Sequence, residues 1–179
     1  MKNFCIAVLF VAMAGLCFAQ APQSSVSVPN TDVFVGYIMT SPDYGGGLFA
    51  YRLNGFEGAF SKGLTSRFAV VATGDVQFGD IFIHHATQFS GTVGGKYSFL
   101  TGRFRPYGIG QAGYAHQDSN GAYAHNVVDG LTFRMGGGAD LQLTPKIYWR
   151  IAQFDEQRMP WGPHRPYYVN LSSGIGYRF

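Results

Sequence analysis

The last thirteen residues of the chain, 167–179 (YYVNLSSGIGYRF), alternate between two kinds of side chain. Counted back from the end, one set is apolar apart from Ser173 and has aromatic residues near both limits: Phe179, Tyr177, Ile175, Leu171, Val169 and Tyr167. The set between them is small or polar apart from Tyr168. Because successive side chains of a strand point to opposite faces, this segment is predicted to be a strand. An apolar face with aromatics at both ends is typical of strands that cross a membrane in a β-barrel.

The first residues are predicted to be a secretory signal and not part of the fold. Lys2 provides a positive charge, an apolar run continues to Phe18, and small residues precede a cleavage point after Ala19, with Ala21 as the alternative. Both cysteines of the chain lie in this segment, so we expect the mature protein to have no disulfide and no cysteine-based site. We therefore divide the chain into a signal peptide (1–19), a disordered Ser/Pro-rich lead-in (20–30) and one domain (31–179).

The composition fits a protein whose outer surface meets lipid. Charged residues make up only 13% of the chain and aromatic residues 16%, and there are 25 glycines. The net charge of +3 comes without a basic cluster, so we expect no nucleic-acid partner. The glycine runs 45–47 and 136–138 lack the Lys-Ser/Thr of a phosphate-binding loop, and we expect no cofactor.

Eight strands are expected, which predicts an all-β fold, an eight-stranded antiparallel up-and-down transmembrane β-barrel. Their expected ranges are 31–39, 53–61, 66–78, 88–99, 105–116, 131–143, 146–155 and 167–179. The expected connections alternate between short ones at 62–65, 100–104 and 144–145 and long ones near 40–52, 79–87, 117–130 and 156–166. In outer-membrane barrels the short turns face the periplasm and the long loops face outward. The phase of 105–116 stays open, because an outward Tyr107 and Ile109 would also turn Gln111 toward lipid.

A soluble up-and-down barrel shows the same alternation with its apolar face turned inward. Two features favour the membrane form: the polar faces consist mainly of Gly, Ser, Ala and Thr, which fit a narrow interior, and charged residues are too few to cover a water-exposed surface. A third is the placement of aromatic residues near the expected strand ends, as in interfacial girdles: Tyr37, Phe60, Phe68, Phe78, Phe89, Tyr97, Phe99, Tyr167 and Phe179.

Motifs in the final third of the chain resemble the OmpA-like outer-membrane β-barrel family. They are Gly136-Gly137-Gly138-Ala139-Asp140, Ile147-Tyr148-Trp149-Arg150, Gln153-Phe154-Asp155 and the terminal Gly174-Ile175-Gly176-Tyr177-Arg178-Phe179. The resemblance implies a bacterial outer-membrane location and recognition of the last strand, through Phe179 and Tyr177, by the barrel assembly machinery. Glu156 departs from the family pattern. We expect no peptidoglycan-binding domain after Phe179, so that family function is not carried over.

Seven charged residues are expected on the inward faces: Glu57, Asp75, Lys96, Arg134, Asp140, Arg150 and Arg178. Charges inside a narrow barrel are costly unless they are paired, so we expect a salt-bridge network that fills the lumen. Asp140 and Arg150 flank a tight turn and are the favoured pair. The alternative is a narrow channel of low conductance with these residues as its gate.

Two other kinds of site were weighed and are not expected. The five histidines, His84, His85, His116, His125 and His164, fall in or beside the expected long loops, but their spacing matches no metal motif. His116, Asp118 and Ser119 contain the residue types of a lipid A-modifying hydrolase, but they lie in a turn-like stretch. We therefore expect neither a metal site nor an enzyme.

The remaining function is a structural or surface-interaction role, adhesin-like, in which the barrel sits in outer-membrane lipid and the loops meet an extracellular ligand. Four loop aromatics are candidate contact residues for that ligand: Tyr44, Tyr51, Tyr123 and Trp161.

Overall fold

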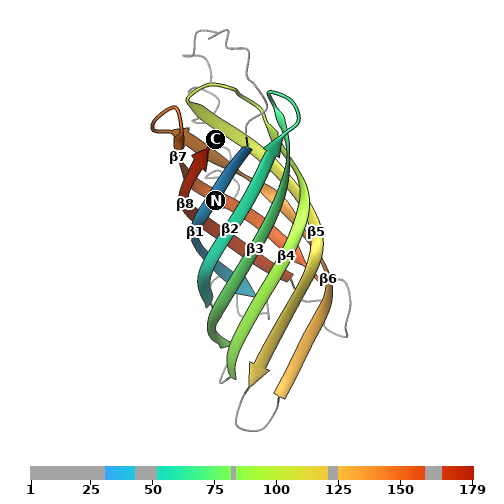
Figure 1. The fold of residues 1–179 in the computed structure, drawn as a ribbon. Coiled ribbons are helices and arrows are strands. Elements are labelled where there is room, and N and C mark those ends of the chain that lie inside the picture. Colours follow the sequence, from blue (N-terminus) through green and yellow to red (C-terminus); the bar gives the residue numbers. More distant parts are fainter. Residues whose placement is uncertain (1–30, 43–51, 82–83, 121–124, 160–166) are drawn as a thin grey trace, which may run out of the picture.

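Eight antiparallel strands form one closed barrel in the computed structural model, which describes residues 31–42, 52–81, 84–120, 125–159 and 167–179 (Figure 1). The strands are β1 (Thr31–Pro42), β2 (Arg52–Gly63), β3 (Phe68–Ile81), β4 (His84–Ser98), β5 (Phe104–Asn120), β6 (His125–Gln142), β7 (Ile147–Arg158) and β8 (Tyr167–Arg178). Each pairs with its neighbours in the chain, and β8 closes onto β1. The expected fold class is confirmed. The expected signal peptide and lead-in lie outside the described residues, among which no helix is long and apolar enough to cross a membrane.

The terminal strand that the sequence singles out completes the barrel. β8 pairs with β1 from Asp32↔Arg178 to Pro42↔Tyr168. Beyond the strand, the Phe179 N–H donates to the Thr31 carbonyl at 2.9 Å. Because β8 pairs with β1 on one side and with β7 on the other, the described sheet has no open edge.

Two of the short turns share a motif that explains their geometry. The residues are Leu64–Phe68 (LTSRF) between β2 and β3, and Leu143–Ile147 (LTPKI) between β6 and β7. In the first, Thr65 Oγ1 accepts the N–H of Phe68 at 2.9 Å; in the second, Thr144 Oγ1 accepts the N–H of Ile147, also at 2.9 Å. The threonine side chain therefore replaces a backbone partner where the chain reverses.

Strands at the opposite end are longer than the sequence suggests. Residues 79–87 and 117–130, expected to be long loops, lie largely within strands, with β3 and β4 paired up to Ile81↔His84 and β5 and β6 up to Asn120↔His125. The expected long connections are therefore wrong for these two hairpins, whose strands are separated only by 82–83 and 121–124, whereas 43–51 and 159–166 separate the other strands at this end. Polar residues resemble a loop in sequence, but a hairpin extending beyond a barrel rim can be polar on both faces.

A bulge in β7 produces the other error. Pairing of β7 with β8 shifts between Arg150 and Gln153, so Ile151 and Ala152 are both exposed. Unbroken alternation along the expected strand 146–155, with Arg150 inward, would turn Ala152 inward as well. The bulge reverses the phase of the rest of β7 and turns Asp155 into the interior, where it is 1% exposed.

The outside of the barrel is apolar and the inside is mainly polar. Exposed large side chains include Met135 (75% exposed), Phe56, Val93, Phe154 and Ile175. The structure settles which face of β5 turns inward, a question that the sequence left open. Tyr107, Ile109 and Gln111 all face the interior and are buried. Gln111 is thereby kept from the apolar surface, and its amide donates to Thr73 Oγ1 at 2.8 Å.

Candidate functional site

The interior of the barrel gathers the charged residues of the inward faces. All seven residues predicted for this network lie there and are between 1% and 8% exposed. They come from β2, β3, β4, β6, β7 and β8, so the network exists only when the barrel is closed. An eight-stranded barrel is just wide enough for its interior to be filled by side chains.

Arg134 on β6 is the centre of one half of the network. Its Nη2 lies 2.9 Å from Glu57 Oε2, its Nη1 3.1 Å from Asp75 Oδ1, and its Nε 2.9 Å from Asp155 Oδ1. A second bond, Nη2 to Asp155 Oδ2 at 2.9 Å, makes the contact with Asp155 bidentate. Arg134 is fully buried and joins three strands.

Asp140 joins the other half. It accepts Lys96 Nζ at 2.5 Å and Arg150 Nε at 3.3 Å. The structure thus brings together the pair that the sequence favoured, Asp140 and Arg150, with Lys96 as the closer partner. Arg150 Nη1 also lies 3.4 Å from Glu57 Oε1, so Glu57 connects the two halves into one network.

Four carboxylates and three cations make up this connected network, since Arg178 contacts none of these acids among the described residues. Neutral side chains also donate hydrogen bonds to two of the carboxylates: Ser90 Oγ to Asp75 at 2.6 Å, and Asn170 Nδ2 to Asp155 at 2.8 Å. Asp155 is the member that the sequence reasoning missed. Its signal was the reversed alternation of Gln153, Phe154 and Asp155, in which the apolar residue has changed face.

Apolar side chains fill the interior on both sides of the network. One cluster toward the short turns consists of Phe34, Ala59, Val71, Tyr107, Ile109 and Tyr148, and the Arg150 guanidinium lies 3.7 Å from the centroid of the Phe34 ring. A second cluster toward the other end consists of Ala115, Met159 and Tyr168. The ion pairs of Arg134 therefore lie between apolar side chains, whereas the Lys96–Asp140 pair borders the open end of the barrel at the short turns.

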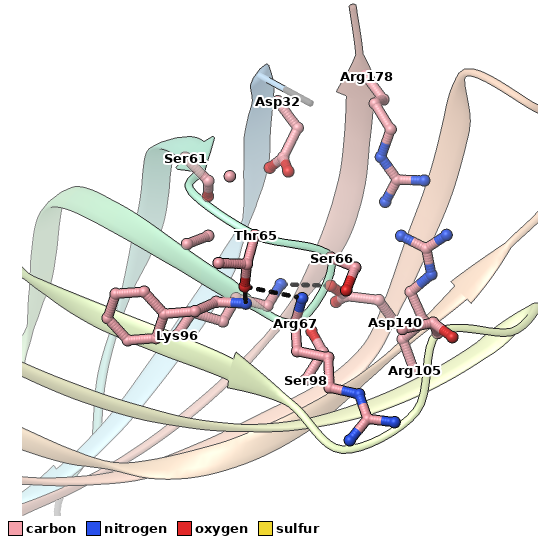
Figure 2. A pocket seen from close by; sticks show the side chains of 14 residues that line it. Asp32, Ser61, Thr65, Ser66, Arg67, Lys96, Ser98, Arg105, Asp140 and Arg178 are labelled. Atoms are coloured by element: carbon pink, nitrogen blue, oxygen red, sulfur yellow. Dashed lines mark hydrogen bonds and ion pairs between the residues drawn. The ribbon is translucent and has the colours of Figure 1, made fainter. Parts of the chain in front are cut away.

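A cavity of about 230 Å³ opens at the short-turn end, outside the first apolar cluster (Figure 2). Its charged lining residues are Asp32, Arg67, Lys96, Arg105, Asp140 and Arg178. Asp32, Arg67 and Arg105 are absent from the sequence prediction. Once the inward phase of Tyr107 is known, the inward position of Arg105, two residues earlier, follows from strand alternation.

His85 and His116 each lie near one carboxylate. His85 Nδ1 lies 2.5 Å from Asp80 Oδ1, and His116 Nδ1 lies 3.9 Å from Asp129 Oδ2. No group of three or more His, Cys, Asp or Glu side chains suited to a metal occurs among the described residues. His84 and His125 begin β4 and β6, within strands and not in long loops as expected, and His164 lies outside the described residues.

The three residues weighed for hydrolysis do not share one face of β5. His116 is in β5 and stacks on the exposed ring of Phe89 at 5.3 Å between centroids. Ser119 accepts the amide of the inward-facing Gln117 at 3.2 Å. An odd separation along a strand places His116 and Ser119 on opposite faces. The loop aromatics Tyr44, Tyr51, Tyr123 and Trp161 lie outside the described residues.

Solved structures with the same architecture are small bacterial barrels. Ail, the attachment invasion locus protein of Yersinia pestis, superposes with a TM-score of 0.63 at 13% identity, covering 86% of this chain and 100% of Ail. Neisserial surface protein A gives 0.66 at 12% identity over 83% of this chain and 97% of that protein. The fold is that of a small outer-membrane β-barrel. The N-terminal barrel domain of Pseudomonas aeruginosa OprF, at 17% identity and a TM-score of 0.52, covers 85% of this chain and 100% of that domain.

These neighbours agree with the resemblance to OmpA-like barrels in fold. No family model matches the sequence, and no curated protein matches it. At identities this low, the similarity establishes a shared fold and not a shared activity.

Proposed function

We propose that this chain spans the bacterial outer membrane as a filled barrel and has a structural or surface-interaction role without catalysis. The observation that carries the proposal is the combination of an apolar outer surface with an ion-paired interior. A soluble barrel has the reverse arrangement. Ion pairs inside and apolar side chains outside suit a barrel surrounded by lipid.

The proposed orientation places the short turns in the periplasm and the β5–β6 tip outside. In Figure 1 the C-terminus lies near the β2–β3 and β4–β5 turns, and the β5–β6 tip lies at the opposite end. Phe179 and Tyr177 are exposed beside one another, with ring centroids 5.1 Å apart. This aromatic pair at the end of β8 supports recognition of the last strand by the barrel assembly machinery.

The proposed surface contacts are made at the end that carries the β5–β6 tip. Ail has been solved in complex with the heparin analogue sucrose octasulfate, which supports ligand binding as a role for this architecture. In this chain the exposed charges of the described outer ends are mixed: Arg52, Asp80, Asp129 and Arg158. We therefore propose an extracellular ligand that does not depend on a single basic patch.

Cysteine labelling of intact cells tests the orientation, because the only native cysteines lie in the expected signal peptide. An impermeant maleimide should label Asp129→Cys on intact cells, and Lys146→Cys only after the outer membrane is opened. The opposite pattern would overturn the proposed orientation.

Shortening of the β5–β6 hairpin tests the surface role. Replacing residues 117–128 by Asn-Gly would join the paired residues His116 and Asp129 through a favoured two-residue turn. Cells carrying this variant should lose adhesion to host cells and matrix proteins while the barrel still folds. The surface role would be contradicted if the variant adhered as well as the wild type and the wild type adhered no better than cells without the protein. The structural role would then remain.

A narrow channel is the second candidate, favoured only by the polar, charged nature of the interior. If Asp140 closes a gate, Asp140→Ala should raise the conductance of the protein in planar bilayers. We expect no rise, since Phe34, Tyr107 and Tyr148 fill the interior beside Asp140.

We also propose that the chain does not modify lipid A. Its expression should leave the mass of lipid A unchanged, and a shifted mass would support an enzymatic role instead.

A further inference from the structure

The mouth of the barrel at the short turns carries positive charge that its own carboxylates leave unpaired. Of the acids lining the cavity, Asp140 is already engaged by Lys96 and Arg150. Arg67, Arg105 and Arg178 also line the cavity and form no ion pair with any described residue. The cavity is thus a concave site with excess guanidinium groups.

Two of these guanidinium groups face one another across the cavity. Figure 2 shows the side chains of Arg105 and Arg178 pointing toward each other, from β5 and β8. Each is held by a neutral acceptor: Arg105 Nε donates to the Gly102 carbonyl at 2.9 Å, and Arg178 Nη1 donates to Gln142 Oε1 at 3.2 Å. Among the described residues, no hydrogen bond involves the Nη atoms of Arg105. Two fixed cations that repel each other are stabilised by an oxyanion placed between them.

A third donor and an acceptor lie in the same cavity. Ser61 is 1% exposed, and its Oγ has no hydrogen-bond partner among the described residues. Asp32 is paired with Ser61 in the β1–β2 register and lines the same cavity as the two arginines. Asp32 Oδ1 accepts the hydroxyl of Tyr148 at 2.9 Å, which leaves Oδ2 as a further acceptor.

We propose that this mouth binds a phosphate group, held by Arg105 and Arg178 and by the Ser61 hydroxyl. The carboxylate of Asp32 selects among oxyanions: a phosphate carrying one proton can donate it to Asp32, whereas sulfate has no proton to donate and is repelled. Inorganic phosphate keeps one proton at neutral pH, whereas phosphate esters, with a second pKa of about 6, have lost most of theirs. In the proposed orientation the site faces the periplasm, and the free ion is the phosphate that can donate a proton to Asp32. A phosphodiester lipid headgroup has no such proton and is the alternative source, held by the two arginines and Ser61 alone.

Titration calorimetry of the folded full chain in a phosphate-free, nonionic detergent tests this site. Inorganic phosphate should bind saturably, and sulfate at least about tenfold more weakly, because a charged hydrogen-bond partner is lost. Arg105→Gln should weaken phosphate binding about tenfold. Lys146→Gln removes the same charge from an exposed site at the same end, outside the cavity, and should change binding less than about twofold.

Absence of saturable phosphate binding, or an equal loss in both variants, would overturn the proposal. If Arg105→Gln fails to fold, Ser61→Ala keeps all charges and should still weaken binding about threefold. Failure of Ser61→Ala to weaken it would then count against the site. Addition of phosphatidylglycerol distinguishes the sources: competition with inorganic phosphate assigns the site to a headgroup, and no competition assigns it to the free ion.

Discussion

Single residues in this barrel act through the network they complete. Arg134 is the clearest case, because its guanidinium serves Glu57, Asp75 and Asp155 together and is fully buried. A buried ion pair contributes modestly compared with apolar packing, but removing one partner leaves the others as uncompensated buried charges. The charge of one residue therefore compensates three buried carboxylates on three other strands.

Arg134→Gln should lower the free energy of unfolding by about 3–5 kcal/mol, because three buried carboxylates lose their cation. Urea unfolding in lipid vesicles measures this change. Arg158→Gln removes a cation from the exposed pair with Glu156 on the next strand and should leave stability unchanged. Equal effects of the two substitutions would contradict a central role for Arg134.

At this scale the sequence predicted which charges face inward, because alternation fixes the face of each residue within an unbroken strand. Glu57, Asp75 and Arg134 followed directly from that rule. It could not predict the hub formed by Arg134, since the partners are set by barrel register and lie 21 to 77 positions away. Asp155 was missed because the rule fails beyond a bulge.

Turns and strand ends lie where the sequence predicts them if local residues determine their position. They differ from the prediction where pairing between strands determines it. The repeated Leu-Thr turn motif is a local signal, and it sits where two of the short connections were expected. The far ends of β5 and β6 are determined by pairing with each other, so their polar sequence gave no sign of a strand.

The turn threonines should contribute measurably to stability. Thr65→Ala and Thr144→Ala each remove the oxygen that accepts a backbone N–H at 2.9 Å and should cost roughly 0.5–1.5 kcal/mol. Thr65→Ser keeps the oxygen and should restore most of the loss. The two alanine effects should add, since the turns share no partner, and urea unfolding midpoints would show whether they do.

Inward and outward glycines of the strands should respond differently to alanine. A Cβ at Gly176 would lie 2.0 Å from Tyr148 Cζ, whereas one at Gly91 would meet nothing within 4 Å. We expect Gly176→Ala to destabilise the barrel by about 1–3 kcal/mol through overpacking and Gly91→Ala to change stability by less than about 0.5 kcal/mol. A larger loss for Gly91→Ala in the same unfolding assay would contradict the assignment of faces.

The whole molecule combines closure, an apolar exterior and a filled interior. Composition and alternation predicted this architecture, which solved barrels of only 12–17% sequence identity share with it. Those same features say little about the ligand, because many sequences satisfy the same inward and outward pattern.

Closure of the whole sheet should be visible on a gel. Because β8 is paired on both sides, the barrel should resist detergent until it is heated, so unboiled and boiled samples should migrate differently. Identical mobility of the two samples of protein refolded into lipid would argue against a closed barrel.

Quenching by brominated lipids tests most directly that the apolar face meets the membrane. Met135 is 75% exposed and directly follows the buried Arg134, so Met135→Trp in a Trp149→Phe, Trp161→Phe background places one probe outside. We predict strong quenching of this tryptophan by bromines deep in the acyl chains and blue-shifted emission. Unquenched emission typical of tryptophan in water, from protein that is folded, would contradict the account.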